Sequence, residues 1–160
     1  MESQGGSKPS LDMAALSMAT KGVLITGILL LIASFLPWQK ECFEVAGVPA
    51  FCGKASAWNG SGSFFGLMMG ILLIVLLLFE VSKLANMSMQ LPFTPSKASA
   101  YLGFAVVVFG LLKFVIVLTS DVSAGLGAWI GIILLAALGY ASFLYMKAEE
   151  AAAAPPATEL

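Results

Sequence analysis

The chain has 160 residues, of which 59% are hydrophobic and only 11% are charged, whereas soluble domains are usually about 45–50% apolar and about 25% charged. Because a small domain in water leaves a large part of its surface exposed, this composition predicts a membrane protein. The formal net charge of −1 and the lack of any Arg or His argue against nucleic-acid binding, most hydrolases and metal sites, so we expect no enzyme activity, cofactor or metal.

Four apolar segments are long enough to cross a bilayer as helices, since a hydrocarbon core of about 30 Å needs about 20 apolar helical residues. The segments are 22–38, 63–81, 100–118 and 126–146. None of them alternates apolar and polar residues as the strands of a transmembrane barrel do. We therefore expect an all-α membrane protein, a four-transmembrane-helix bundle over residues 21–146. An N-terminal segment (1–20) and a C-terminal tail (147–160) flank this domain.

The distribution of lysines predicts the orientation of these spans. Five lysines fall on one side and two on the other, namely Lys8, Lys21, Lys83, Lys97 and Lys147 against Lys40 and Lys54. Because positive residues favour the cytoplasmic side, we expect a multi-pass cell-membrane protein with both termini in the cytoplasm. Three tryptophans map to the external helix ends, where indole rings favour the membrane interface. These predicted anchors are Trp38, Trp58 and Trp129.

The first predicted external loop contains both cysteines of the chain. Cys42 and Cys52 flank a turn sequence, Gly47-Val48-Pro49. An external loop lies in an oxidising compartment, where a disulfide can form and persist. We expect this disulfide to close a small hairpin in which residues 43–45 pair with 50–51, stabilising it by roughly 3 kcal/mol on a chain-entropy estimate. The hairpin either only staples the loop or forms a recognition surface. A redox-active pair is less expected, because catalytic cysteines usually occur as Cys-x-x-Cys.

Glycines recur along the predicted helices in patterns that let a neighbouring backbone approach closely. The second helix has one every four residues, the third has two seven residues apart, and the fourth is rich in small residues. The glycines in question are Gly62, Gly66, Gly70, Gly103, Gly110, Gly127 and Gly131. We expect the first three to pack against another helix. The small-residue faces fit either packing within one bundle or packing between protomers.

Two charged residues fall within the predicted spans. Glu80 lies two heptads after Gly66 and so shares its face of the second helix, near the cytoplasmic end. Lys113 lies about 9 Å below the external end of the third helix at 1.5 Å rise per residue. Such charges cost at least ~2.5 kcal/mol on insertion scales and are functional candidates by default. For Lys113 we expect instead that the side chain extends outward, to lipid phosphate or to a carboxylate of an external loop. The candidate carboxylates are Glu41, Glu44 and Asp121.

Three short motifs carry a resemblance to known proteins. Leu36-Pro37-Trp38 ends the first span, Ala57-Trp58-Asn59-Gly60 precedes the second, and Gly125-Leu126-Gly127-Ala128-Trp129 opens the fourth. Together they resemble small four-helix integral membrane proteins of uncharacterised function that are common in bacteria, especially actinobacteria. The resemblance covers roughly residues 21–146 and implies a fold without an activity.

The first loop carries a second, weaker resemblance. The order Trp38, Cys42 and Cys52 is similar to the claudin-type signature, Trp-x-x-Cys followed by a second Cys. Claudins have four helices, cytoplasmic termini and a disulfide-bearing first external loop. In this chain the Trp–Cys gap is one residue longer, Leu36-Pro37 replaces Gly-Leu, and the loop is too short for a full extracellular sheet. We therefore interpret the likeness as convergence.

Three functional hypotheses follow from these features. The leading one is a non-enzymatic structural or accessory integral membrane protein that self-associates or joins a larger membrane complex. The second is a small transporter or channel subunit that uses Lys113 and Glu80, and the third is a claudin-like adhesion or barrier protein. The expected partners are the lipid bilayer and other membrane proteins or further copies of the chain, with no nucleic acid.

Overall fold

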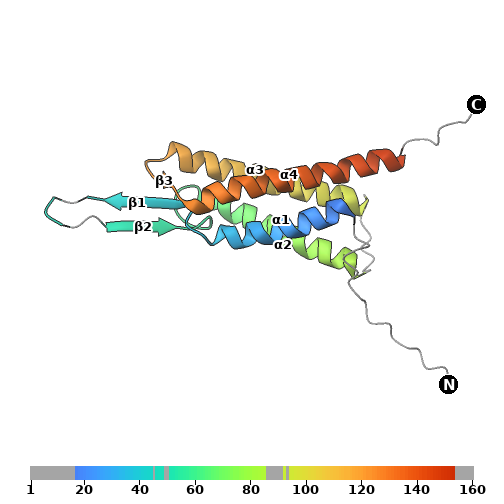
Figure 1. Ribbon diagram of the computed structural model, residues 1–160, viewed down its shortest axis with the longest axis horizontal. Helices are drawn as coiled ribbons and strands as arrows, with labels where there is room; N and C mark the ends of the chain where they lie inside the picture. Colours follow the sequence, from blue (N-terminus) through green and yellow to red (C-terminus); the bar gives the residue numbers. More distant parts are fainter. Residues whose placement is uncertain (1–16, 45, 49–50, 86–91, 93, 154–160) are drawn as a thin grey trace, which may run out of the picture.

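The computed structural model describes residues 17–44, 46–48, 51–85, 92 and 94–153, and within them the chain is mostly helical (Figure 1). The helices are α1 (Met18–Ser34), α2 (Ser63–Leu84), α3 (Pro95–Thr119) and α4 (Leu126–Ala153). Three short strands, β1 (Gln39–Phe43), β2 (Phe51–Ala55) and β3 (Ser123–Ala124), form one sheet. The expected helices are therefore present, but the expectation of an all-α chain was wrong.

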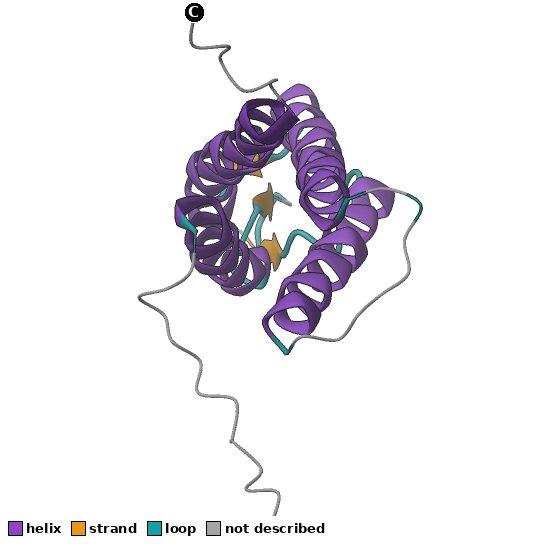
Figure 2. Cartoon of the chain, turned by 90° about the vertical axis from the view of Figure 1, so that its right-hand side faces the viewer, coloured by secondary structure: helices purple, strands orange, loops and turns teal. Residues whose placement is uncertain are grey.

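The four helices lie side by side and alternate in direction along the chain (Figures 1 and 2). Each helix contacts two others: α3 packs against α2 and α4, while α1 packs against α4 and α2. The sheet lies at the end where α1 and α3 finish, which we call the hairpin end. The opposite end, where α1 begins and α4 finishes, we call the Glu80 end after the acidic residue buried there.

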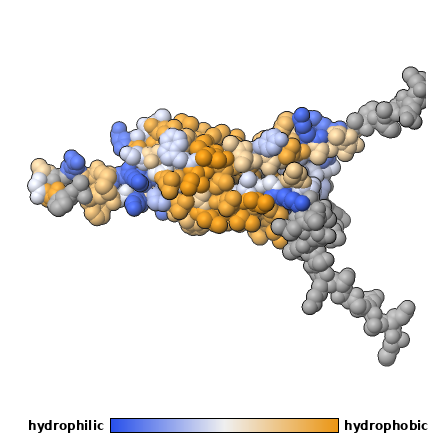
Figure 3. All heavy atoms as spheres, in the orientation of Figure 1, coloured by the Kyte–Doolittle hydropathy of each residue, from blue (hydrophilic) through white to orange (hydrophobic). Residues whose placement is uncertain are grey.

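Three of the helices are long and apolar enough to cross a membrane: α2 with 22 residues, α3 with 25 and α4 with 28. The first helix is also apolar but has only 17 residues. Apolar residues cover the middle of the helical part of the molecule, and hydrophilic residues gather towards its two ends (Figure 3). An apolar belt between polar ends is consistent with a membrane protein.

The first helix is displaced from its predicted position, because it runs from Met18 to Ser34 rather than over residues 22–38. Ser17 caps its start, with its hydroxyl accepting from the backbone N–H of Thr20. The helix ends shortly before Pro37 because proline disfavours helical geometry in the residue that precedes it. Residues 35–38 are apolar although they do not continue the helix. The chain turns back there, and Trp38 is completely buried.

The sheet is built around the predicted disulfide between Cys42 and Cys52, which the structure confirms. These two residues face each other in the antiparallel pair β1–β2, and the ladder extends down to the pair Gln39↔Ala55. The hairpin is therefore longer at its base than we predicted, whereas Val45 and Ala50 lie outside the described residues. On its other side β1 pairs with β3, Gln39 being opposite Ala124. The hairpin extends along the long axis beyond the helix ends (Figure 1).

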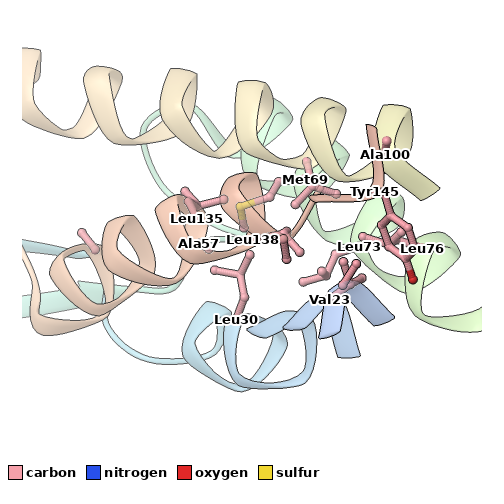
Figure 4. Packing of buried hydrophobic residues seen from close by; sticks show 14 of the residues in the cluster. Val23, Leu30, Ala57, Met69, Leu73, Leu76, Ala100, Leu135, Leu138 and Tyr145 are labelled. Atoms are coloured by element: carbon pink, nitrogen blue, oxygen red, sulfur yellow. The ribbon is translucent and has the colours of Figure 1, made fainter. Parts of the chain in front are cut away.

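Large apolar side chains from three helices fill the middle of the molecule (Figure 4). We call this region the central apolar layer; it consists of six fully buried side chains, Leu30, Met69, Leu73, Leu76, Leu135 and Leu138. The fourth helix continues beyond this core, past Met146 to Ala153, because its last residues are mainly alanine and glutamate, which favour helix. The predicted boundary between span and tail therefore falls inside one continuous helix.

Candidate functional site

Two polar clusters lie at opposite ends of the central apolar layer. The hairpin-end cluster consists of Lys113, Gln39 and the loop residues Asn59 and Ser61. The Glu80 cluster consists of Glu80, Lys83, Thr20, Ser99 and Tyr145. Together they contain both charges that the sequence places within the predicted spans, and they use different chemistry to hold them.

At the hairpin end Lys113 is completely buried. Its ammonium donates to two backbone carbonyls, that of Ser61 at 2.6 Å and that of Asn59 at 3.0 Å. This differs from our expectation of an outward path to lipid phosphate or to a carboxylate. The loop between β2 and α2 folds back over the helix ends and brings its own carbonyls to the side chain. Hydrogen bonding by these carbonyls offsets part of the cost of removing the charge from water.

Gln39 holds this loop in place. Its side-chain amide donates to the carbonyl of Ser61 at 2.7 Å, and its side-chain oxygen accepts from the backbone N–H of Ser61 at 3.0 Å. Gly60 has a φ of +75°, and a Cβ there would collide with the Gln39 side chain. Glycine is therefore required for both its conformation and its size. The carbonyl of Ser61 accepts from both Gln39 and Lys113, which ties β1, the loop and α3 together.

The glycines of α2 receive this loop rather than another helix. A Cβ on Gly66 would overlap the carbonyl group of Ala57, and one on Gly70 would overlap the ring of Trp58. Gly62 instead approaches Ile116 of α3, and a Cβ on Gly66 would also meet the Lys113 side chain of that helix at 3.6 Å. Our expectation of a helix–helix contact was therefore wrong for Gly70, and at Gly66 the closest approach is made by the loop. The glycine spacing marked a close approach, but it could not say which segment approaches.

The glycines of α3 and α4 serve two different kinds of contact. A Cβ on Gly103 would meet the hydroxyl of Ser142, and one on Gly110 would meet Leu135, so these two positions let α3 and α4 approach closely. Gly127 and Gly131 instead leave room for the indole of Trp38. The small-residue face of α4 therefore packs against both a helix and a folded-back aromatic side chain.

The three tryptophans predicted as interface anchors have different surroundings. Trp38 is fully buried, and its indole N–H donates to the carbonyl of Ala33 at 3.0 Å, so it does not lie at a surface. Trp58 is half-buried, donates to the hydroxyl of Ser34 at 2.9 Å and stacks on Phe35. Trp129 is 52% exposed, which leaves it as the one member of the three with the exposure that an interface anchor needs.

At the other end Glu80 is also completely buried. One carboxylate oxygen accepts from the ammonium of Lys83 at 3.0 Å, and the other lies 2.9 Å from the hydroxyl of Tyr145. Lys83 also reaches the hydroxyl of Ser99 at 2.8 Å and that of Tyr145 at 3.3 Å. All three ammonium hydrogens therefore have an acceptor.

The Glu80 cluster joins all four helices. Thr20 belongs to α1, Glu80 and Lys83 to α2, Ser99 to α3 and Tyr145 to α4. The hydroxyls of Tyr145 and Thr20 are 2.8 Å apart. Sequence reasoning singled out Glu80 alone. The i,i+3 spacing of Glu80 and Lys83 is a usable signal for an ion pair, but nothing local identifies Thr20, Ser99 or Tyr145 as its neighbours.

A hollow of about 480 Å³ opens beside the base of the hairpin. It is lined by Glu41, Cys42, Phe43, Ser61, Ser120, Asp121 and Val122. Two of these residues are acidic, and neither accepts from Lys113, which donates to backbone carbonyls instead. Within the described part of the chain, no group of three His, Cys, Asp or Glu side chains gathers in a way that could hold a metal ion.

These features define a class rather than an individual protein: a mostly helical chain, consistent with a membrane protein, with a disulfide-closed hairpin at one end. Comparison with known proteins adds no narrower assignment, since no protein-family model, no curated protein and no solved structure matches the chain.

Proposed function

We propose that this protein is a non-enzymatic structural or accessory component of a membrane, which associates with another membrane protein through its hairpin. In this proposal all four helices span the bilayer, and the Glu80 end faces the cytoplasm with both termini. The lysine distribution supports this orientation. A helix of 17 residues lies at the short limit of about 17–25 residues for a spanning helix, so α1 fits it least easily.

The observation that carries the proposal is that both buried charged groups have their hydrogen-bond partners within the chain. Lys113 is held by loop carbonyls, and Glu80 is held by Lys83 and Tyr145. Among the residues that the structure describes, no buried side-chain nitrogen or oxygen lacks a hydrogen-bond partner. Groups that are hydrogen-bonded in this way stabilise a fold, which supports a structural role.

The hairpin supplies the surface for association. Phe43 and Phe51 face each other across its strands and are 62% and 77% exposed, and Val48 in the turn is 61% exposed. The hairpin extends past the helix ends (Figure 1), so in our proposal these apolar side chains lie outside the bilayer. Exposed apolar side chains that lie together commonly mark a protein contact. The disulfide holds the hairpin in shape before binding, which lowers the entropy lost on association.

A transporter that uses both Lys113 and Glu80 is less well supported. The two residues lie at opposite ends of the central apolar layer, whose members offer no polar group to carry a proton or an ion. A claudin-like barrier role has no support beyond the disulfide itself, because the described residues form a sheet of only three short strands.

The test compares the full-length wild-type chain with hairpin variants after purification in mild detergent. We expect a stable assembly, detected by its mass in light scattering and by cross-linking, that the double substitution Phe43→Ser and Phe51→Ser disrupts. Lys54→Ser, an exposed residue on the opposite face of β2, is the matched control and should leave the assembly intact. Cross-links between copies of this chain would identify self-association. A monomer without partners, or an assembly that tolerates the double substitution, would contradict the proposal.

A further inference from the structure

We propose that Glu80 is a proton-binding site, loaded from the surface at the start of α1 through a chain of hydroxyl groups. This hydroxyl relay runs from Ser17 to Thr20, Tyr145 and Glu80, and the successive oxygens are 2.8, 2.8 and 2.9 Å apart. Ser17 is exposed at one end, and Glu80 is completely buried at the other. This inference goes beyond the proposed structural role and does not depend on it.

The number of hydrogens that the hydroxyl groups can donate shows how this relay transfers a proton. Each hydroxyl has one hydrogen to donate, so Tyr145 cannot donate to Thr20 and Glu80 at the same time. When Glu80 is ionised, its oxygen takes the hydrogen of Tyr145, Thr20 donates to Tyr145, and Ser17 donates to Thr20. Every hydroxyl then points towards the carboxylate, and every oxygen has a partner.

Uptake of one proton reverses this order. Tyr145 passes its proton to Glu80 and takes that of Thr20, Thr20 takes that of Ser17, and Ser17 takes one from water. The result is a neutral carboxylic acid that donates to Tyr145, with all the hydroxyls now pointing towards the surface. One proton enters and one is bound, and the heavy atoms keep their hydrogen-bond distances. The same geometry therefore serves both protonation states.

The proton changes the strongest contact in the cluster. Of the charged side chains that the structure describes, only Lys83 lies within ion-pair distance of Glu80. The groups that face the cluster from the other helices are neutral: Thr20 on α1, Ser99 on α3 and Tyr145 on α4. A neutral Glu80 leaves the ammonium of Lys83, which is 22% exposed, without its counter-charge. Protonation of Glu80 therefore removes the ion pair at the junction of the four helices.

The test measures proton uptake by the full-length protein in lipid nanodiscs after a rapid drop in pH. Infrared absorption of protonated carboxyl groups reports the reaction. We expect a component of this signal that Glu80→Gln removes. Tyr145→Phe and Thr20→Val keep the carboxylate but interrupt the hydroxyl relay. We expect them to slow that component by about tenfold, which corresponds to a barrier about 1.4 kcal/mol higher. Tyr140→Phe and Thr26→Val are matched controls on the same two helices and should leave the rate unchanged.

The outcomes separate a relay from a merely structural cluster. A structural role would lower the unfolding temperature of the Tyr145→Phe and Thr20→Val variants without slowing proton uptake. Uptake at the wild-type rate in both variants would overturn the proposal, and so would a signal that persists in full in Glu80→Gln. If Glu80→Gln does not fold, the two relay variants still decide the question, because each retains the carboxylate.

Discussion

The two ends of the helices hold a buried charge in different ways. At the hairpin end Lys113 is held by main-chain carbonyls, and those carbonyls belong to a loop that Gln39 and the sheet hold in place. At the Glu80 end the charge is held by side chains, one or more from each helix, and the described residues place no strand there. The carbonyls at the hairpin end are fixed in the main chain. At the Glu80 end, in our proposal, the hydroxyl hydrogen bonds can reverse direction and the carboxylate can be neutralised. A protein can therefore combine a rigid end and a responsive end on the same four helices.

The largest expected effect concerns the close approach that makes the hairpin end rigid. Gly66→Ala should destabilise the protein by about 4 kcal/mol, because the new methyl group would overlap backbone atoms of Ala57 that cannot move aside easily. Denaturant or thermal unfolding in detergent measures the change. Gly139→Ala is the matched control, since a methyl group there meets Val107 at an ordinary distance of 3.6 Å. Equal effects of the two substitutions would show that the loop does not occupy the glycine face.

The next prediction removes the buried charge of the rigid end. Lys113→Met keeps most of the side-chain volume but leaves the carbonyls of Asn59 and Ser61 without the ammonium, and should cost about 3 kcal/mol of unfolding free energy. Lys54→Met, at an exposed position of the hairpin, should cost almost nothing. If the two variants are equally stable, the carbonyls do not depend on Lys113, and its side chain reaches lipid or solvent instead.

A smaller effect is expected when the covalent link at the rigid end is removed. Replacing Cys42 and Cys52 together by serine should lower stability by about 2 kcal/mol, at the low end of the usual range for a disulfide and somewhat below the chain-entropy estimate of roughly 3 kcal/mol. The loss should be concentrated in the strands, because the helices contact one another independently of the disulfide. Hydrogen exchange of the backbone amides, followed by mass spectrometry, can locate it. Faster exchange throughout α2 and α3 would mean that the hairpin supports the whole helical core.

The smallest expected effect on stability belongs to the responsive end. Tyr145→Phe removes one hydroxyl from a cluster whose ion pair remains, and should cost about 1 kcal/mol. Tyr140→Phe, at an exposed position of the same helix, is the matched control and should leave the stability unchanged. Thermal or denaturant unfolding in detergent measures both variants. Equal losses in the two would show that the hydroxyl of Tyr145 does not stabilise the cluster.

Glycine positions show how far sequence reasoning reached for the site. The four-residue spacing of Gly62, Gly66 and Gly70 indicated a close approach, and the structure has one at each of them. The identity of the approaching segment could not be read locally, because the loop of Ala57 and Trp58 is brought there by the fold. Lys113 gives the same lesson. Its burial depends on backbone carbonyl groups. Because every residue carries one, no pattern of side chains in the sequence could predict which carbonyls bind Lys113.

What the sequence determined by itself was the set of apolar helices and the disulfide. Length and hydrophobicity are properties of a segment, and a short loop with two cysteines leaves each of them few other partners. Tertiary structure decided the rest: that Trp38 turns inward, that a loop caps Lys113, and that four helices meet around Glu80. The physical reason is that these contacts join groups far apart in the chain. Their partners are set by which helices are neighbours, and that choice is made only when the apolar faces pack together.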